Sequence, residues 1–380
     1  MNKMVYETPT RKAQPTLYDV SRLSGVSSAT VSRVFSGSAP VSDEIRERVE
    51  NAARTLSYEP SHAARSLAGR KTKTLGAIFP EIASGFYADI LAGIDEVAAE
   101  SGFDVLAAFV GKQRSRPELV KRLLRQGRVD ALLLLNLDDT LDLGPETIDQ
   151  LPIVLIDRAI NGSKLPALGM DNVGGAEAMI EHLFEQGHRR IAIVTGPPGN
   201  YDSQQRLLGC RRAFGRLGVP IDERMQWSGD PNKQSDFSIV GGAEAMLQWT
   251  DQLVWPGAFT MGSGVEVAQE LLKSKLPLPD AIFCLNDAMA IGMLNEFRRA
   301  GVSVPGDVAL AGFDNVEGAA HLSLTSVACP MRLMGQVAAR WAVELVTKNA
   351  RPVGHRLQVR LVIRNSSLGK KSAHLASERR

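Results

Sequence analysis

Residues 27–35, SSATVSRVF, combine small hydroxyl side chains with one arginine at helical spacing. The apolar residues of this stretch form one stripe that a helix would turn toward a core: Val31, Val34 and Phe35. Ser28 and Ala29 lie on other faces, where small side chains would let the helix approach the floor of a DNA groove, and Arg33 could donate two hydrogen bonds to guanine. Two hydroxyl groups near the helix start suit phosphate oxygens: those of Ser27 and Thr30. A small helical bundle with a solvated polar face is the plain alternative.

Three short helices are predicted in this part of the chain. The first covers residues 17–24, with Thr16 as its cap and Gly25 as its end. Ser27 caps the second helix and Ser42 caps a third, whose apolar positions continue the same small core. Two helices joined by a tight turn form a helix-turn-helix unit, and here its second helix carries the groups described above.

The segment that follows, SYEPSHAARSLAGRKTKT at residues 57–74, is basic and predicts one short helix from His62 to Ala68. A helix of this length is unstable alone in water, but it can fold against DNA when two copies meet. Leu67 would then be an exposed wedge that enters a base step of the minor groove. A plain linker is the alternative interpretation.

Charge is distributed unevenly along the chain. Residues 1–73 contain 12 lysines and arginines against 7 acidic residues, whereas the remainder contains 32 against 35. A basic module on a faintly acidic body suits a polyanionic partner for the module alone.

From Thr74 onward, apolar strands alternate with amphipathic helices, which predicts a parallel sheet covered on both faces. The alternation starts again at Gly174, so two similar α/β lobes are expected. Ligands of such folds bind beyond the carboxyl ends of the strands. The polar residues that follow four strands are therefore candidates for a pocket: those after 74–81, 152–158, 190–196 and 281–287.

Five polar residues follow the last two of these strands: Asn200, Asp202, Arg206, Asn286 and Asp287. Asp202, Arg206 and Asp287 could each form bidentate hydrogen bonds with two neighbouring hydroxyl groups of a ligand. Arg158 also follows a strand and is a weaker candidate.

Composition and motifs argue against several other classes. The chain has 380 residues, of which 44% are apolar and 23% charged, as in ordinary soluble proteins. It contains no apolar run of the roughly 18–20 residues that a membrane span requires, and its N-terminus lacks the apolar stretch of a signal peptide. A cytoplasmic location is therefore expected. A transport binding protein would need such a peptide and would not need residues 16–73.

No enzyme, cofactor or metal site is expected. The chain contains no GxSxG, P-loop or HExxH motif and no GxGxxG that opens a helix. Arg206 with Asp287 could in principle be catalytic, but no nucleophile or base accompanies them. His182 and His188 do not share a helix face and suit a core or surface role. Three widely spaced cysteines match no metal spacing and are expected to be reduced core thiols: Cys210, Cys284 and Cys329.

Seven stretches carry a family resemblance by their order and spacing: LYDVSRLSGVSSATVSRVFSG, LSYEPSHAARSLAGRKTKTLGAIFP, GFYADILAGI, DNVGGAEAMIEHLFEQGHRRIAIVTGP, RLLGCRRAF, IFCLNDAMAIGML and VPGDVALAGFDN. From Thr16 to about Ser367 the chain resembles the LacI/GalR family of bacterial transcription regulators. Ser21 and Ser24 stand where that family usually has Ala. Both are small, so the fold is expected to tolerate them.

The resemblance implies an α/β protein with an N-terminal helix-turn-helix three-helix DNA-binding domain and a hinge helix. These would join a two-lobed, doubly wound effector domain that resembles a periplasmic binding protein. The implied boundaries are a disordered leader at 1–15, the helix-turn-helix domain at 16–60, the hinge helix and linker at 61–73, the effector-binding and dimerisation domain at 74–367, and a disordered tail at 368–380.

The resemblance also implies partners. The protein would be a homodimer, or a pair of dimers, that binds a palindromic double-stranded DNA operator and has no membrane partner. A small effector between the lobes, a sugar or sugar derivative ahead of a nucleoside, would control operator affinity. Repression relieved by the effector is the default, and activation or corepression within the same family is the alternative.

Residue by residue, the implied DNA contacts are Thr16, Tyr18, Ser27, Ser28, Ala29, Thr30 and Arg33 in the helices and His62, Arg65, Leu67 and Arg70 in the hinge. The implied effector-binding residues are Phe86, Tyr87, Arg158, Asn200, Asp202, Arg206, Phe259, Asn286 and Asp287. Phe86 and Tyr87 stand where the family often has ligand-stacking aromatics, and a core or interface role suits either equally well. About two dozen extra residues around 231–255 precede Phe259, so Phe237 is the alternative aromatic.

Overall fold

The structure is a computed structural model that describes residues 15–36, 39–58, 71–80, 85–110, 116–125, 127–135, 152–157, 165–197, 199–219, 254–256, 259–274, 277–350 and 352–369. Several predictions lie outside these residues: those for the leader up to residue 14, for His62, Arg65, Leu67 and Arg70 in the hinge, for Arg158, for the extra segment with Phe237, and for the tail from residue 370.

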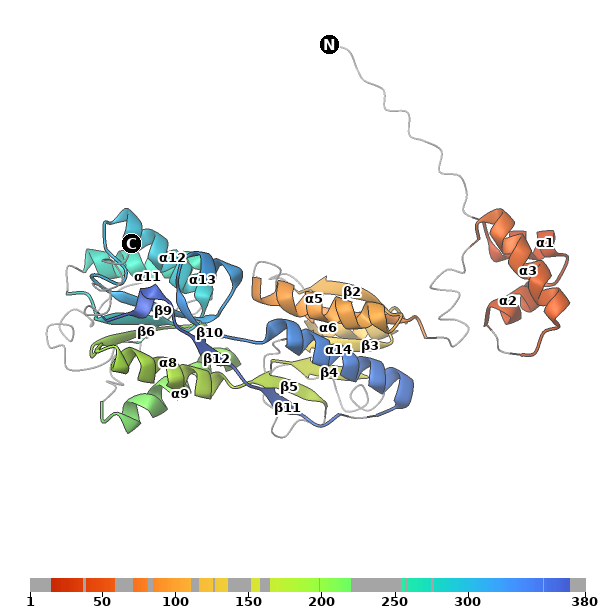
Figure 1. Ribbon diagram of the computed structural model, residues 1–380. Coiled ribbons are helices and arrows are strands. Elements are labelled where there is room, and N and C mark those ends of the chain that lie inside the picture. The colour runs from red at the N-terminus through yellow and green to blue at the C-terminus, as the bar shows by residue number, and fades with distance from the viewer. Residues whose placement is uncertain are drawn as a thin grey trace, which may run out of the picture. The chain divides into compact units, whose positions relative to one another are not determined.

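The described chain divides into two compact units, one with the residues up to Thr74 and residues 121–130, and one with the rest. The first unit contains three helices, drawn in red in Figure 1: α1 (Leu17–Ser24), α2 (Ser28–Ser36) and α3 (Asp43–Leu56). One buried cluster joins them: Val20, Val31, Val34, Val49, Ala52 and Ala53. The periodicity of the sequence therefore predicted this core correctly.

The first two predicted helix caps are confirmed. Thr16 and Asp19 form a capping box in which each side chain bonds the other residue's backbone N–H. Gly25 ends α1 in the left-handed conformation, with φ of 68°. Ser27 accepts a hydrogen bond of 3.1 Å from the backbone N–H of Thr30 at the start of α2.

Ser42 is the N-cap residue of α3, as predicted, but its side chain makes no capping hydrogen bond. Asp43 and Glu44 lie in the first turn, where the helix dipole favours negative charge. Electrostatics rather than a hydroxyl cap therefore favours this helix start.

Two serines in α1 are accommodated by local hydrogen bonds. Ser24 donates to the carbonyl of Val20 at 2.7 Å, and Ser21 donates to the carbonyl of Val26 at 2.6 Å. Each hydroxyl is satisfied close to its own backbone, as serines within helices often are. The helix keeps its full length from Leu17 to Ser24.

The first lobe is a six-stranded sheet in the order β11-β5-β4-β3-β1-β2. Its strands are β1 (Thr74–Phe79), β2 (Asp104–Phe109), β3 (Ala131–Leu135), β4 (Ile153–Ile156), β5 (Ala167–Met170) and β11 (His355–Leu357). Its helices are α5 (Gly85–Glu100), α6 (Arg116–Arg125) and α14 (Met331–Lys348). The central strands β1, β3, β4 and β5 are fully buried, as their continuous apolar sequence predicted.

The second lobe repeats this arrangement with the order β12-β10-β9-β8-β6-β7. Its strands are β6 (Ile191–Thr195), β7 (Val254–Pro256), β8 (Ala281–Cys284), β9 (Ala309–Asp314), β10 (Thr325–Ala328) and β12 (Arg360–Val362). Its helices are α8 (Asn172–Glu185), α9 (Tyr201–Arg216), α11 (Met261–Lys273), α12 (Asp287–Arg299) and α13 (Glu317–His321). Every pairing with a described register is parallel in this sheet except that of β10 with β12.

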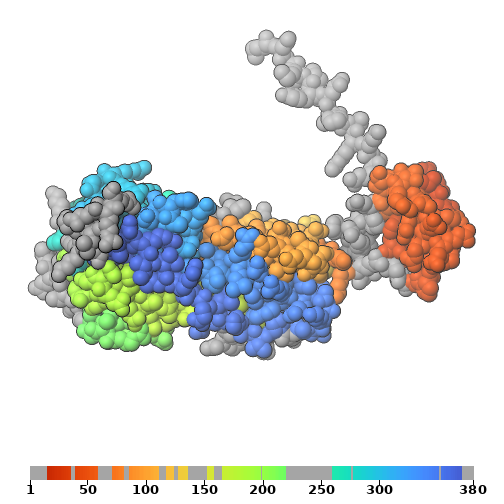
Figure 2. Space-filling model, in the orientation of Figure 1, coloured from red at the N-terminus to blue at the C-terminus, as the bar shows by residue number. Residues whose placement is uncertain are grey.

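The chain passes between the lobes at three points, after β5, after β10 and between β11 and β12. As a result, α14 of the C-terminal half packs on α5 of the N-terminal half, as Figure 1 shows. Gly93 and Gly335 permit this close approach, because a Cβ on either would collide with the backbone of the other helix. The blue C-terminal chain lies against both orange and yellow-green surface in Figure 2.

Two buried histidines hold the end of the described chain. Nε2 of His182 lies 2.8 Å from Oγ of Ser367, and Nε2 of His188 lies 3.0 Å from the Ser367 carbonyl oxygen. A core role for both histidines is confirmed. The short helix η2 (Asn365–Ser367) thereby joins α8. All three cysteines are buried and free, which confirms the expected core thiols.

Candidate functional site

The predicted DNA-facing surface of α2 is exposed. Ala29 and Arg33 are exposed and lie four residues apart, so they share one face of the helix. The hydroxyl oxygens of Ser27 and Thr30 lie 2.9 Å apart at the helix start. On α1, Tyr18 is 76% exposed, although it is a large aromatic residue. This surface carries the groups that phosphate and base-edge contacts require.

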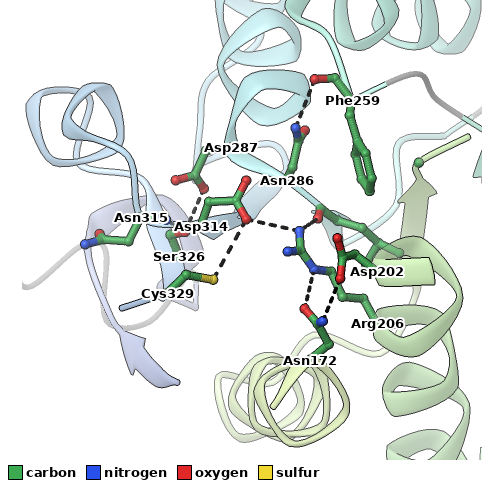
Figure 3. A network of polar contacts seen from close by, with 12 residues as sticks. Asn172, Asp202, Arg206, Phe259, Asn286, Asp287, Asp314, Asn315, Ser326 and Cys329 are labelled. Atoms are coloured by element: carbon green, nitrogen blue, oxygen red, sulfur yellow. Dashed lines mark hydrogen bonds and ion pairs between the residues drawn. The ribbon is translucent and has the colours of Figure 1, made fainter. Parts of the chain in front are cut away.

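A second polar cluster gathers around Arg206 at the carboxyl edge of the second sheet (Figure 3). Its Nε donates to Oδ1 of Asn172 at 2.9 Å, and its Nη1 donates to the Leu285 carbonyl at 2.6 Å. The same Nη1 lies 3.1 Å from Oδ1 of Asp314. Asn172 in turn donates from Nδ2 to Oδ1 of Asp202 at 2.9 Å. The guanidinium is therefore fixed on several sides, although Arg206 is only 3% exposed.

Aromatic rings complete the surroundings of this guanidinium. Its central carbon lies 3.9 Å from the ring centroid of Phe313 and 5.8 Å from that of Phe259. A flat cation over ring faces is favourable when water is excluded. Phe259 itself has φ of 58° and packs against Gly196, where a Cβ would collide with the ring. A glycine after β6 is therefore needed to admit this ring.

Acidic groups outnumber the described cations in this cluster. Burial raises the pKa of Asp314 to about 6, although Arg206 favours its ionised form. Burial and then the neighbouring Asp202 raise the pKa of Asp157 well above its ordinary value. With both carboxyl groups ionised, no described residue donates a hydrogen bond to Asp157. Its side chain lies within hydrogen-bonding reach of the Asp202 carboxyl group, so one of the two must carry a proton for that bond to form. Asp157 follows β4 of the first sheet, so the cluster draws on both lobes.

The backbone of Asp157 is also unusual. Its φ is 60°, in the left-handed region that residues other than glycine rarely occupy. A strained backbone together with an unsatisfied buried carboxyl group is costly for folding alone. Such combinations are typical of ligand sites.

Sequence comparisons identify both parts of the chain. Residues 16–61 match the family described as bacterial regulatory proteins, lacI family. Residues 72–248 match periplasmic binding proteins and sugar binding domain of LacI family, and residues 180–367 match a periplasmic binding protein-like domain. A relative named HTH-type transcriptional regulator CelR, from Thermobifida fusca, is 34% identical over 94% of this chain and 99% of its own. The chain belongs to the LacI family.

Other relatives and solved structures agree with this assignment. HTH-type transcriptional repressor CytR of Escherichia coli (strain K12) is 30% identical over 93% of this chain and 96% of its own. The structure of a CelR–cellobiose complex has a TM-score of 0.64, 33% identity, and coverage of 93% of this chain and 99% of that one. A lac repressor dimer bound to operator and the anti-inducer ONPF has a TM-score of 0.73, 26% identity, and the same coverage. This LacI-family member is a DNA-binding transcriptional regulator.

The described helices are all too short or too polar to span a lipid bilayer. No group of three or more histidines, cysteines or acidic residues in the described part of the chain is arranged to hold a metal ion.

Several predicted effector-site residues of this LacI-family chain do converge. Asp202 and Arg206 belong to the cluster, and Phe259 borders it. Asn286 donates from Nδ2 to the Phe259 carbonyl at 3.0 Å and accepts from the N–H of Met289. Asn200 caps α9 by accepting from the N–H of Ser203 at 2.9 Å. The two asparagines thus position helices and a loop, while Asp202 and Arg206 provide the buried charge.

Asp287 lies deeper than the sequence suggested. It is fully buried, and its two carboxyl oxygens accept hydrogen bonds from Oγ of Ser326 at 2.6 Å and from the N–H of Val316 at 2.9 Å. Burial raises its pKa to about 8. These contacts hold the loop after β9 against α12, which favours a positioning role over direct ligand contact.

Phe86 and Tyr87 lie in an aromatic group of the first lobe. Their ring centroids are 5.3 Å apart, and Tyr87 lies 6.0 Å from Phe79, which stacks on Phe109. Phe86 is only 7% exposed, whereas Tyr87 is half-buried. The geometry favours a core role for Phe86 and leaves Tyr87 the more accessible of the pair.

Sequence reasoning missed four residues of the cluster: Asn172, Asp157, Asp314 and Cys329. All four lie at strand ends: Asp157 and Cys329 directly follow β4 and β10, Asp314 ends β9, and Asn172 comes two residues after β5. The predicted strand 152–158 was among the candidates, but Arg158 was chosen there and Asp157 was overlooked. The other three lie at the ends of strands to which the strand-end rule was not applied, and Sγ of Cys329 lies 3.9 Å from Oδ1 of Asp314.

Proposed function

We propose that this chain is a homodimeric repressor that binds a two-fold-symmetric operator and releases it when an uncharged, hydroxyl-rich effector binds at the Arg206 cluster. The single observation that supports the effector site is Asp157, a fully buried carboxyl group that faces the Asp202 carboxyl group and, when both are ionised, has no hydrogen-bond donor among the described residues. A ligand hydroxyl group would supply that donor. Repression is supported by the relative CytR, which is named a transcriptional repressor.

The charges of the cluster set the class of effector. Asp157, Asp202 and Asp314 surround one described guanidinium, so a phosphate or carboxylate ligand would add a further negative charge to a buried acidic site. A neutral sugar donates hydroxyl hydrogens to carboxylates and accepts from the guanidinium. A sugar is therefore the proposed effector, in keeping with the cellobiose of the CelR complex. Similarity to DNA-binding regulators supports a cytoplasmic location for the protein.

The effector proposal is tested on the full-length protein. Its melting temperature is measured with cellobiose, other neutral sugars, nucleosides and a sugar phosphate, because a ligand of the folded state raises it by mass action. We expect a neutral sugar to stabilise the protein and to weaken its binding to a duplex that the protein itself selects from random-sequence DNA. Stabilisation by the sugar phosphate alone would overturn the effector class.

The DNA-binding proposal is tested by Arg33→Ala. We expect preference for one base pair in each half-site to relax, at a cost of about 1–3 kcal/mol for that contact. Arg54→Ala is the matched control, because Arg54 also lies on a helix of the same unit but bonds Asn51 on its own helix. Selection of the same sequence motif by Arg33→Ala and the wild type would contradict the assignment.

A further inference from the structure

The chain enters the first lobe through a carboxylate clamp at Asp130. Its Oδ1 accepts from the N–H of Thr72 at 2.6 Å and from the Thr72 hydroxyl at 2.9 Å. Its Oδ2 accepts from the N–H of Lys73 at 2.7 Å. One carboxylate thus holds three donors on two successive residues. These are the first residues described after the segment that leads from the DNA-binding helices.

The backbone around the clamp is shaped to allow these bonds. Lys73 has φ of 50°, a left-handed conformation that turns its N–H and that of Thr72 toward the same carboxylate. The N–H of Asp130 donates to the Thr74 carbonyl at 2.8 Å, one step before the paired residues Leu75 and Ala131. Side chain and backbone of Asp130 therefore both tie the entering chain to the start of β3.

The second lobe contains a matching clamp at Asp280. This residue precedes β8 as Asp130 precedes β3, and its N–H donates to the Arg190 carbonyl at 2.8 Å. Its Oδ2 accepts from the N–H groups of Arg189 and Arg190 at 3.0 and 2.9 Å. An ion pair with the Arg190 side chain at 2.8 Å completes it. The chain held there only connects α8 to β6 within the same lobe.

In both clamps an aspartate that precedes a strand accepts hydrogen bonds from two successive backbone N–H groups. The two clamps differ in the segment of chain that they hold. In the second lobe the clamp closes a short connection whose two ends both belong to the lobe. In the first lobe one end is the chain that arrives from the DNA-binding helices. The Asp130 clamp therefore fixes the backbone of Thr72 and Lys73 at the point where that chain reaches β1.

The sheet links this clamp to the effector cluster. Asp130 precedes the amino end of β3, β3 pairs with β4 along its length, and Asp157 directly follows the carboxyl end of β4.

We propose that Asp130 is a positioning residue for operator binding, which holds Thr72 and Lys73 in place where the chain from the DNA-binding helices reaches β1. This inference rests on the proposed function, because it requires that the chain bind an operator. It assigns Asp130 no contact with DNA or effector. Removal of the clamp should therefore change operator affinity without changing the DNA-contacting surface.

The test compares Asp130→Asn with the matched control Asp280→Asn in the full-length protein. Binding is measured to a duplex that the wild type selects from random-sequence DNA and to an unselected duplex of the same length. We expect Asp130→Asn to bind the selected duplex about tenfold more weakly, within the usual range of coupling between sites, and the unselected duplex as the wild type does. Asp280→Asn should lower the melting temperature and leave both affinities unchanged.

Thr72→Val provides a second variant that keeps the carboxylate and both backbone donors. It removes one of three hydrogen bonds and fills a buried position with a side chain of similar shape, so we expect a smaller loss in the same direction. It carries the test alone if Asp130→Asn does not fold, and wild-type affinity would then overturn the inference.

Two outcomes would overturn the inference alone: Asp130→Asn binds the selected duplex as tightly as the wild type, or it loses affinity equally for both duplexes. In the second case the DNA-contacting surface itself would be impaired. A wild type that selects no duplex would instead overturn the proposed function, and the inference with it.

Discussion

The two lobes have the same sheet order and differ in the residues at the carboxyl edges of their sheets. The second lobe carries a fixed set of polar groups, in which Arg206, Asn172 and Asp314 satisfy one another. The first lobe contributes Asp157, whose carboxyl group faces that of Asp202 and has no donor among the described residues while both are ionised. The polar groups at the edge of the second sheet are thus held in place by one another, whereas the carboxyl group at the edge of the first sheet is not.

This difference suggests how a ligand could control the protein. A ligand can shift the balance between two arrangements only through its different affinity for them. On the proposed function, the fixed cluster of the second lobe would hold a ligand in both arrangements, whereas Asp157 would accept from the ligand only in the arrangement that brings it beside Asp202 and Arg206. Asp157 would therefore provide the selectivity for that arrangement.

Removal of the anchor of the second lobe should have the largest effect. Arg206→Met replaces the buried guanidinium with an apolar chain and leaves Asp314 without its ion pair. Breaking a buried pair costs about 3–5 kcal/mol of unfolding free energy. We expect a loss of this size in urea unfolding at pH 7.5. The deficit should shrink toward pH 4, because Asp314, whose pKa in the folded state is about 6, becomes protonated and no longer needs a partner.

Arg216→Met is the control for this prediction. Arg216 lies on the same helix, but it is exposed and pairs with Glu177 and Glu181 at the surface, so its replacement should leave the free energy of unfolding nearly unchanged. Equal losses in the two variants would show that the Arg206 cluster is not a preorganised anchor.

The sequence allowed the helices of the first unit and both lobes to be predicted, because caps and hydrophobic periodicity are local signals. It also singled out Asp202 and Arg206, since strand ends converge in parallel sheets. It could not tell that Asp287 turns inward to Ser326, or that Asp157 comes to face Asp202. Those facts depend on which side chains meet after the sheets pack, and the linear pattern does not encode that.

Asp157→Asn tests the carboxyl group at the edge of the first sheet. The raised pKa of Asp157 means that its protonated form stabilises the folded state, and this contribution is lost as pH rises above the ordinary carboxyl value of about 3.9. Asparagine stays neutral at every pH. We therefore expect the variant to be more stable than the wild type at pH 7.5, by about 1–3 kcal/mol, with a difference that vanishes near pH 4.

The same variant should bind the stabilising sugar more weakly, because a neutral amide accepts a weaker hydrogen bond than a carboxylate. Asp104→Asn, at an exposed position on β2, is the control and should change neither property. If Asp157→Asn destabilises the protein at pH 7.5, the carboxylate is satisfied in the folded protein, and the contrast between the two edges disappears.

Ser326→Ala tests the role of Asp287 at the edge of the second sheet, where we expect the smallest effect. Oγ of Ser326 donates to Asp287 and accepts from the N–H of Asn315 at 3.0 Å, so its loss should cost about 1–2 kcal/mol of unfolding free energy. Thr347→Ala is the control, because the Thr347 hydroxyl donates to the Val343 carbonyl on its own helix, and its loss should leave the free energy of unfolding unchanged.

If Asp287 only positions the loop, the folded Ser326→Ala variant should bind the sugar with nearly the affinity of the wild type. Sugar affinity is measured under conditions in which both proteins are fully folded. A complete loss of sugar binding in folded Ser326→Ala would instead place Asp287 in contact with the ligand and give the second lobe a second direct acceptor.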